Sequence, residues 1–140
     1  MNVVDSSGWL EYFGAGRNAD FFSEPIEDTT GLLVPTISLY EVFKRILQQR
    51  GETAALRAVA YMQSGEIVDL TSTIALHAAK ISTDLKIPMA DSVMLASARE
   101  SEAVLWTQDS DFEHLEGIKY IKAGKALIGG NRGRGANFDP

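Results

Sequence analysis

Apolar and polar residues follow one another along the chain in a pattern that predicts strands and helices in turn. Short apolar runs, typical of buried strands, lie at 1–5, 32–37, 66–70, 103–107 and 118–121. Segments that favour helices lie between them, at 9–13, 18–28, 38–49, 52–63, 71–85 and 90–100. Strands that alternate with helices indicate an α/β fold with a mainly parallel sheet.

Two of these helices have the clearest patterns. In 38–49, one apolar stripe with helical spacing is formed by Leu39, Val42, Phe43, Ile46 and Leu47. The segment 90–100 is apolar almost all round, which is typical of a buried helix. Residues 6–8 are expected to form a turn between the first strand and the first helix.

Composition narrows the possible functions. The chain has 140 residues, no cysteine and two histidines, so thiol catalysis and a cysteine-ligated zinc site are excluded. Thirteen basic and nineteen acidic residues give a net charge of −6, which argues against sequence-independent binding of nucleic acid. No apolar run approaches the length of a membrane span, and no secretory signal is visible, so we expect a cytoplasmic protein with no membrane partner.

The chain is long enough for one domain, which we expect at 1–128. The last twelve residues, 129–140, hold four of the twelve glycines and two arginines. Such a composition is typical of a flexible tail.

Acidic residues follow several of the expected strands. Asp5 ends the first strand, and Asp109 and Asp111 follow the fourth. Glu41 and Asp91 lie in the first turns of the helices at 38–49 and 90–100. Each has a structural explanation. Asp5 could cap the first helix, and either Asp109 or Asp111 could cap a short helix before His114. Glu41 could belong to a capping box that begins at Ser38, and the dipole of its helix favours a negative charge at Asp91.

The acids are harder to explain as a set. The carboxyl ends of parallel strands meet at one edge of a sheet, so Asp5 and Asp109 are expected to lie together there. Asp91 shares a helix face with apolar residues and points inward, where a carboxylate is costly unless it has a partner such as a cation. Oxygen ligands without histidine suit Mg²⁺ or Mn²⁺, and the implied chemistry is metal-assisted phosphodiester hydrolysis.

Four segments resemble the PIN-domain ribonucleases, specifically the VapC-type toxins of toxin–antitoxin pairs. They are VVDSS at the N-terminus, the segment from Ser38 to Val42, ADSVMLASA around Asp91, and WTQDSDF. The similarity spans about residues 1–122 and rests on the order and spacing of the four segments.

The resemblance implies a three-layer α/β/α sandwich around a five-stranded parallel sheet. It implies an endoribonuclease that uses Mg²⁺ or Mn²⁺ held by a carboxylate quartet, which maps onto Asp5, Glu41, Asp91 and Asp109. Within that quartet, we assign the metal ligands as Asp5, Asp91 and Asp109. Supporting residues would be Ser6, Thr107 and Asp111, and the partners would be an RNA substrate, a small VapB-like antitoxin and a second copy of the chain.

Two other classes of function stay open, and the first is a phosphotransfer domain of one of two kinds. A receiver-like phosphoacceptor domain would use Asp69, although the N-terminus has one acid where such domains have an adjacent pair. A haloacid-dehalogenase-like phosphotransferase would need an acid at the position of Ser7. The second alternative is a PIN-like binding module without catalysis, against which stands the complete acidic set.

Overall fold

A computed structural model describes residues 1–124 of the chain. Its strands are β1 (Asn2–Val4), β2 (Leu32–Pro35), β3 (Glu66–Val68), β4 (Val104–Thr107) and β5 (Ile118–Tyr120). Its α-helices are α1 (Ser6–Phe13), α2 (Ala19–Glu27), α3 (Thr36–Arg50), α4 (Glu52–Met62), α5 (Ser72–Leu85) and α6 (Met89–Glu100). Two short 3₁₀ helices are η1 (Thr29–Gly31) and η2 (Ser110–Phe112). The expected tail, 129–140, lies outside the described residues.

The five strands form one parallel sheet in the order β3-β2-β1-β4-β5, which confirms the predicted fold class. After β3 at one edge, the chain crosses back to place β4 on the other side of β1. The strand order therefore reverses next to β1, where α/β proteins form their sites. A receiver domain has the order 2-1-3-4-5, so the sheet does not support the phosphoacceptor alternative. Asp69 follows β3, at the edge of the sheet, and is exposed.

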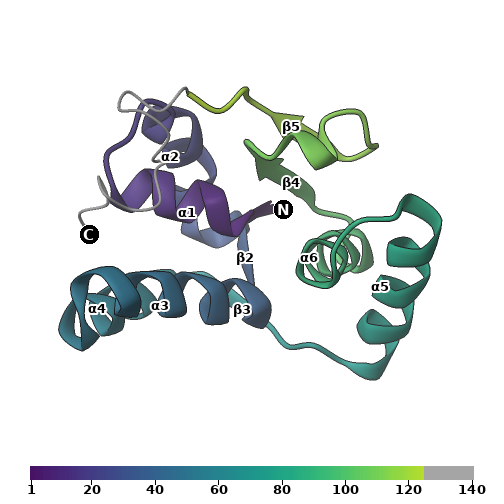
Figure 1. The fold of residues 1–140 in the computed structure, drawn as a ribbon, viewed down its shortest axis with the longest axis horizontal. Helices are drawn as coiled ribbons and strands as arrows, with labels where there is room; N and C mark the ends of the chain where they lie inside the picture. The colour runs from purple at the N-terminus through teal and green to yellow at the C-terminus, as the bar shows by residue number, and fades with distance from the viewer. Residues whose placement is uncertain (125–140) are drawn as a thin grey trace.

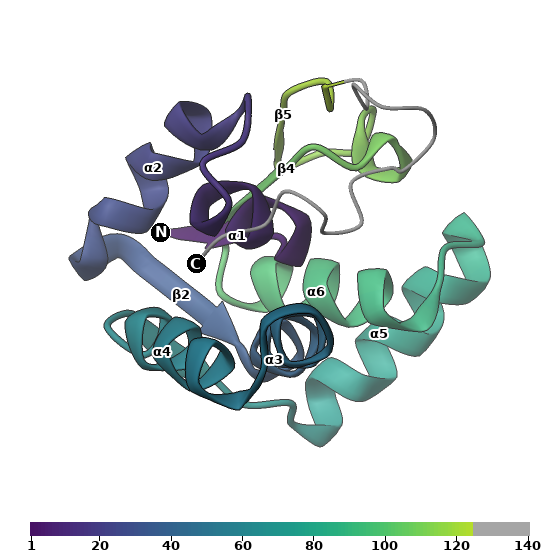
Figure 2. The same cartoon turned by 60° about the vertical axis from the view of Figure 1, so that its left-hand side comes forward.

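Helices cover both faces of the sheet (Figures 1 and 2). On one face, α5 and α6 pack against a cluster that includes Val3, Leu33 and Leu105. On the other face, the first four helices enclose a cluster that includes Val4, Val34 and Trp106. Neighbouring strand residues thus point to opposite cores, as the pleat requires. This arrangement is the three-layer sandwich that the resemblance implies.

Two helices begin earlier than the sequence pattern predicts. Residues 6–8 are not a turn, because Asp5 accepts a hydrogen bond from the Ser6 N–H and α1 starts there. The helix expected at 38–49 starts at Thr36, directly after Pro35, whose extended conformation precedes the first helical residue. A side-chain cap sets the start of α1 and the extended Pro35 precedes the start of α3, and apolar periodicity reports neither.

The shift in α3 changes the position of Glu41. This residue lies in the second turn, and the predicted capping box is wrong, because the Ser38 hydroxyl donates to the Pro35 carbonyl at 2.7 Å. Glu41 is therefore free of any capping task at the start of its own helix.

Close packing at the start of α1 depends on Gly8. A Cβ atom there would lie 2.5 Å from Phe22 and 2.8 Å from Val4, far inside normal contact distances. The absence of a side chain at Gly8 lets α1 lie directly against the end of β1. None of the helices within residues 1–124 combines the length and apolar character that a membrane crossing requires.

Candidate functional site

Asp5 lies at the end of β1 and is almost fully buried, with 5% of its surface exposed. Its Oδ1 atom accepts a hydrogen bond from the Ser6 N–H, 2.9 Å away. Its Oδ2 atom accepts from the hydroxyls of Ser7, at 3.1 Å, and Thr107, at 2.9 Å. The carboxylate is therefore both a helix cap and the acceptor of a small hydroxyl network, so the capping explanation is correct but incomplete.

The segment after β4 is linked to the end of β1 through Thr107. This residue is fully buried, and its hydroxyl oxygen also accepts from the Asp109 N–H at 2.9 Å. The Asp109 Oδ1 atom in turn accepts from the Asp111 N–H and caps η2. One hydroxyl thus holds Asp5 and the backbone of Asp109 in a fixed relation.

Glu41 reaches the same edge of the sheet from α3. Its Oε1 atom accepts a hydrogen bond of 2.6 Å from the Ser6 hydroxyl. Ser6 and Ser7 therefore serve two different carboxylates from adjacent positions. The contact brings the N-terminal part of α3 to the end of β1, beside Asp5.

The closest group of acids joins α6 with the segment after β4. One carboxylate oxygen from each of Asp91, Asp109 and Asp111 lies within 4.8 Å of the others. Asp91 and Asp109 are half-buried and Asp111 is exposed. This group contains Asp111, which the sequence ranked as a supporting residue, in addition to two of the three expected ligands.

Burial and mutual repulsion raise two pKa values at this edge. Burial is the largest cause of the rise in the Asp5 pKa from 3.8 to about 6, opposed by its hydroxyl partners and aided by the charges of Asp109 and Glu41. The pKa of Asp91 rises from 3.8 to about 7, first through burial and then through the negative charges of Asp5, Asp109, Glu41 and Asp111. The negative charges of the other four acids thus all act on Asp91.

Within residues 1–124, no lysine or arginine forms an ion pair with these acids. Among the described residues, the hydrogen bonds to the Asp5 carboxylate come from hydroxyl and backbone donors, which supply no positive charge. Several carboxylates in one place remain ionised together when a divalent cation lies between them. An all-oxygen donor set with no histidine fits Mg²⁺ or Mn²⁺.

Sequence patterns missed some residues that hold this edge in place. Ser7 bonds directly to Asp5, and the only signal for it was a second hydroxyl after the aspartate. Asn18 and Gln108 bond to each other at 2.8 Å, although 90 residues separate them. No local pattern in the sequence marks that pair.

A separate cavity of about 630 Å³ lies between α1, α3 and α4. Its lining residues are Tyr12, Phe13, Arg50, Ala54, Arg57, Ala58 and Tyr61. The lining contains no carboxylate, so this cavity lacks the donors that a divalent cation requires.

Comparison with solved structures finds close similarity of fold at low sequence identity. A toxin–antitoxin complex from Klebsiella pneumoniae matches with a TM-score of 0.72 and 19% identity over 85% of this chain and 96% of that chain. VapBC2 from Rickettsia felis, bound to a DNA fragment from its promoter, matches with a TM-score of 0.67 and 12% identity over 86% and 97% of the two chains. VapC20 from Mycobacterium tuberculosis, a toxin that cleaves the sarcin–ricin loop, matches with a TM-score of 0.67 and 15% identity over 81% and 93%.

Comparison of the sequence with curated proteins gave no match. The family model of the PIN domain matches residues 3–118, which include every acid at the sheet edge. Since that match covers most of the sequence, the chain belongs to the PIN-domain family.

Proposed function

We propose that this protein is a Mg²⁺- or Mn²⁺-dependent endoribonuclease that hydrolyses RNA phosphodiester bonds, and that it is the toxin of a VapBC-type toxin–antitoxin pair. The observation that carries the proposal is the meeting of Asp91, Asp109 and Asp111, with oxygens within 4.8 Å, beside the buried Asp5. Membership of the PIN family and the similarity in fold to toxin structures support it.

Each acid has a proposed task. Asp5, Asp91 and Asp109 would hold the cation, Asp111 would add a ligand on the exposed side, and Glu41 would complete the quartet. A divalent cation bound there would lower the pKa of a water molecule and offset charge on the phosphodiester. Ser6 and Thr107 orient Glu41 and Asp5 through the hydrogen bonds described above.

The chemistry is tested with the purified protein and a structured RNA. We expect cleavage in Mg²⁺ or Mn²⁺, no cleavage in EDTA, and none by Asp91→Asn, because an amide cannot hold the cation as an anion does. Thermal melting of Asp91→Asn checks that the fold survives. Wild-type cleavage by this variant would disprove the site assignment. A well-folded wild-type protein that neither binds Mn²⁺ nor cuts RNA would favour the non-catalytic binding module.

The biological role is tested separately, in cells. We propose a cytoplasmic toxin that forms a homodimer and is inhibited by a small VapB-like antitoxin. The toxin–antitoxin complexes with the same fold support the antitoxin partner. Expression of the chain alone should arrest cell growth. Co-expression of a small antitoxin-like protein encoded by the neighbouring gene should restore it. Unimpaired growth with an active enzyme would refute the toxin role, and light scattering of the purified protein tests the dimer.

A further inference from the structure

Asn18 uses its side chain in an unexpected way. It precedes α2, a position where asparagine commonly accepts a hydrogen bond from its own helix. Here the side chain makes no such bond and is buried, with 6% of the residue exposed. Its Nδ2 atom donates instead to Gln108 Oε1, at 2.8 Å, and to the Lys122 carbonyl, at 3.0 Å.

The loop that carries Asn18 is itself held by α1. The Asn18 N–H donates to Glu11 Oε2 at 2.8 Å, and Gln108 Nε2 points to the other oxygen of Glu11, at 3.5 Å. One amide therefore ties the α1–α2 connection to the segments that follow β4 and β5. Lost bonds at a buried amide are costly, because its donors cannot turn to water.

The other end of this link lies beside the acids. Gln108 stands between Thr107, whose hydroxyl bonds to Asp5, and Asp109. Its side chain reaches toward α1 and α2, while that of Thr107 reaches Asp5, as expected where strand side chains alternate. The backbone from Thr107 to Asp109 is thus held by two contacts: the Gln108 side chain bonds to Asn18, and the Thr107 side chain bonds to Asp5.

We propose that Asn18 is a positioning residue for the Asp109 carboxylate. Its amide, acting through Gln108, holds the segment from Thr107 to Asp109 so that Asp109 meets Asp91 and Asp111. The consequence for cation binding rests on the function proposed above, whereas the consequence for the arrangement of the three carboxylates does not.

The experiment measures Mn²⁺ affinity and stability side by side. Mn²⁺ is titrated into metal-free wild type, Asn18→Ala, Gln108→Ala and the double variant, with free Mn²⁺ followed by electron paramagnetic resonance, and each protein is melted in EDTA. We expect each single variant to weaken Mn²⁺ binding by about ten- to a hundredfold, the range for groups that orient metal ligands. The double variant should bind no more weakly than either single variant, because both changes break one link.

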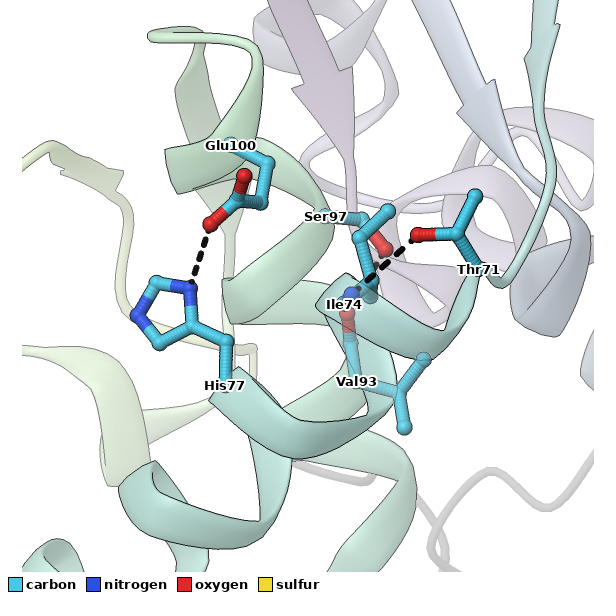
Figure 3. Close-up of polar contacts among 6 residues, drawn as sticks. All are labelled: Thr71, Ile74, His77, Val93, Ser97 and Glu100. Carbon is cyan, nitrogen blue, oxygen red and sulfur yellow. Dashed lines mark hydrogen bonds and ion pairs between the residues drawn. The ribbon is translucent and has the colours of Figure 1, made fainter.

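Thr71→Ala is the matched control. Thr71 caps α5 by accepting a hydrogen bond from the Ile74 N–H at 3.2 Å (Figure 3). Loss of the hydroxyl should lower the melting temperature and leave Mn²⁺ affinity within about twofold of wild type, since its hydrogen bond is to the Ile74 N–H and not to any of the five acids. If Asn18→Ala and Gln108→Ala behave like this control, the positioning role is refuted.

Crystal structures of the metal-free proteins separate this inference from the proposed function. In Asn18→Ala, or in Gln108→Ala if the first variant does not fold, the three carboxylates should no longer lie within the 4.8 Å seen here. A wild type that binds no Mn²⁺, together with displaced carboxylates in the variant, would refute the metal site and support the positioning role. An unchanged carboxylate arrangement in a folded variant would overturn it.

Discussion

Acidic side chains on the surface of α5 and α6 pair with basic side chains, whereas those at the sheet edge face other acids. On the helices, Glu100 Oε2 lies 3.0 Å from His77 Nδ1, and Asp84 Oδ2 lies 2.9 Å from Lys80 Nζ (Figure 3 shows the first pair). At the sheet edge, Asp5 and Asp91 face other acids, and within residues 1–124 no basic side chain pairs with them.

The two groups of acids differ in their effect on the stability of the fold. Exposed pairs such as Lys80 with Asp84 contribute little to stability, and their loss costs little. Burial, aided by neighbouring carboxylates, raises the pKa of Asp5 and Asp91, so their ionised forms lower stability in the absence of a cation. Such a cluster is expected where function, rather than folding, requires the residues.

The largest difference between the two regions is expected when one acid in each, at the sheet edge and on α6, is replaced by its amide. Asp109→Asn should reduce RNA cleavage by about a thousandfold or more, because it removes part of a charge stabilisation of several kcal/mol. Glu100→Gln should leave cleavage unchanged, because Glu100 is exposed and its carboxylate pairs with His77 on the helix surface. Initial rates of RNA cleavage at saturating Mg²⁺ measure both effects. A similar loss of rate in the two variants would contradict the distinction between functional acids at the sheet edge and surface acids on the helices.

The stability of the metal-free protein should fall as the pH rises. Asp5 and Asp91 have pKa values of about 6 and about 7 in the folded protein, above 3.8 for the unfolded chain, so folding takes up protons between these values. Their contribution is favourable at pH 4 and is lost progressively by about pH 7. Each unit of pKa difference corresponds to about 1.4 kcal/mol, reduced at Asp91 by its half-exposed position, so we expect a total of a few kcal/mol.

Urea denaturation in EDTA between pH 4 and 8 measures this slope. Asp91→Asn should flatten it, and Mn²⁺ at pH 8 should restore stability by binding the folded state. Stability that rises with pH from 4 to 7 in the wild type would contradict the assigned direction of the two pKa shifts.

The hydroxyl of Thr107 should have an intermediate effect. Thr107→Val keeps the shape of the side chain but removes a donor to Asp5 and the acceptor for the Asp109 N–H. We expect Mn²⁺ affinity to fall by about ten- to a hundredfold and stability by about 1–3 kcal/mol.

Thr83→Val is the matched change on α5, where the exposed hydroxyl bonds to the Ala79 carbonyl at 3.0 Å. It should alter neither quantity appreciably, because water replaces the lost hydrogen bond. Calorimetric titration with Mn²⁺ and urea denaturation compare the two valine variants.

The smallest effects are expected from the helix-surface pairs. Lys80→Ala and His77→Ala should each change the free energy of unfolding by less than about 1 kcal/mol, because both pairs are exposed to solvent. Mn²⁺ affinity should stay the same in both. A larger loss in either variant would show that α5 and α6 depend on their surface pairs rather than on the apolar contacts beneath.

By itself, the sequence determined the succession of strands and helices, the parallel sheet and the gathering of Asp5 and Asp109 at one edge. Apolar periodicity reports which residues are buried, and parallel strands end at a common edge whatever their order. Trp106 lies in the apolar run at 103–107, which predicted a buried strand, and is 4% exposed.

Tertiary structure alone decided the strand order, the link from Ser6 to Glu41 and the place of Asp111 beside Asp91. It also decided the bond between Asn18 and Gln108, which joins two connections 90 residues apart. These contacts depend on how the layers pack together and on the caps that set where each helix starts. Neither feature produces a periodic pattern of apolar residues in the sequence. A sequence pattern can therefore locate the acids, while the hydrogen bonds that aim them arise only when distant segments pack together.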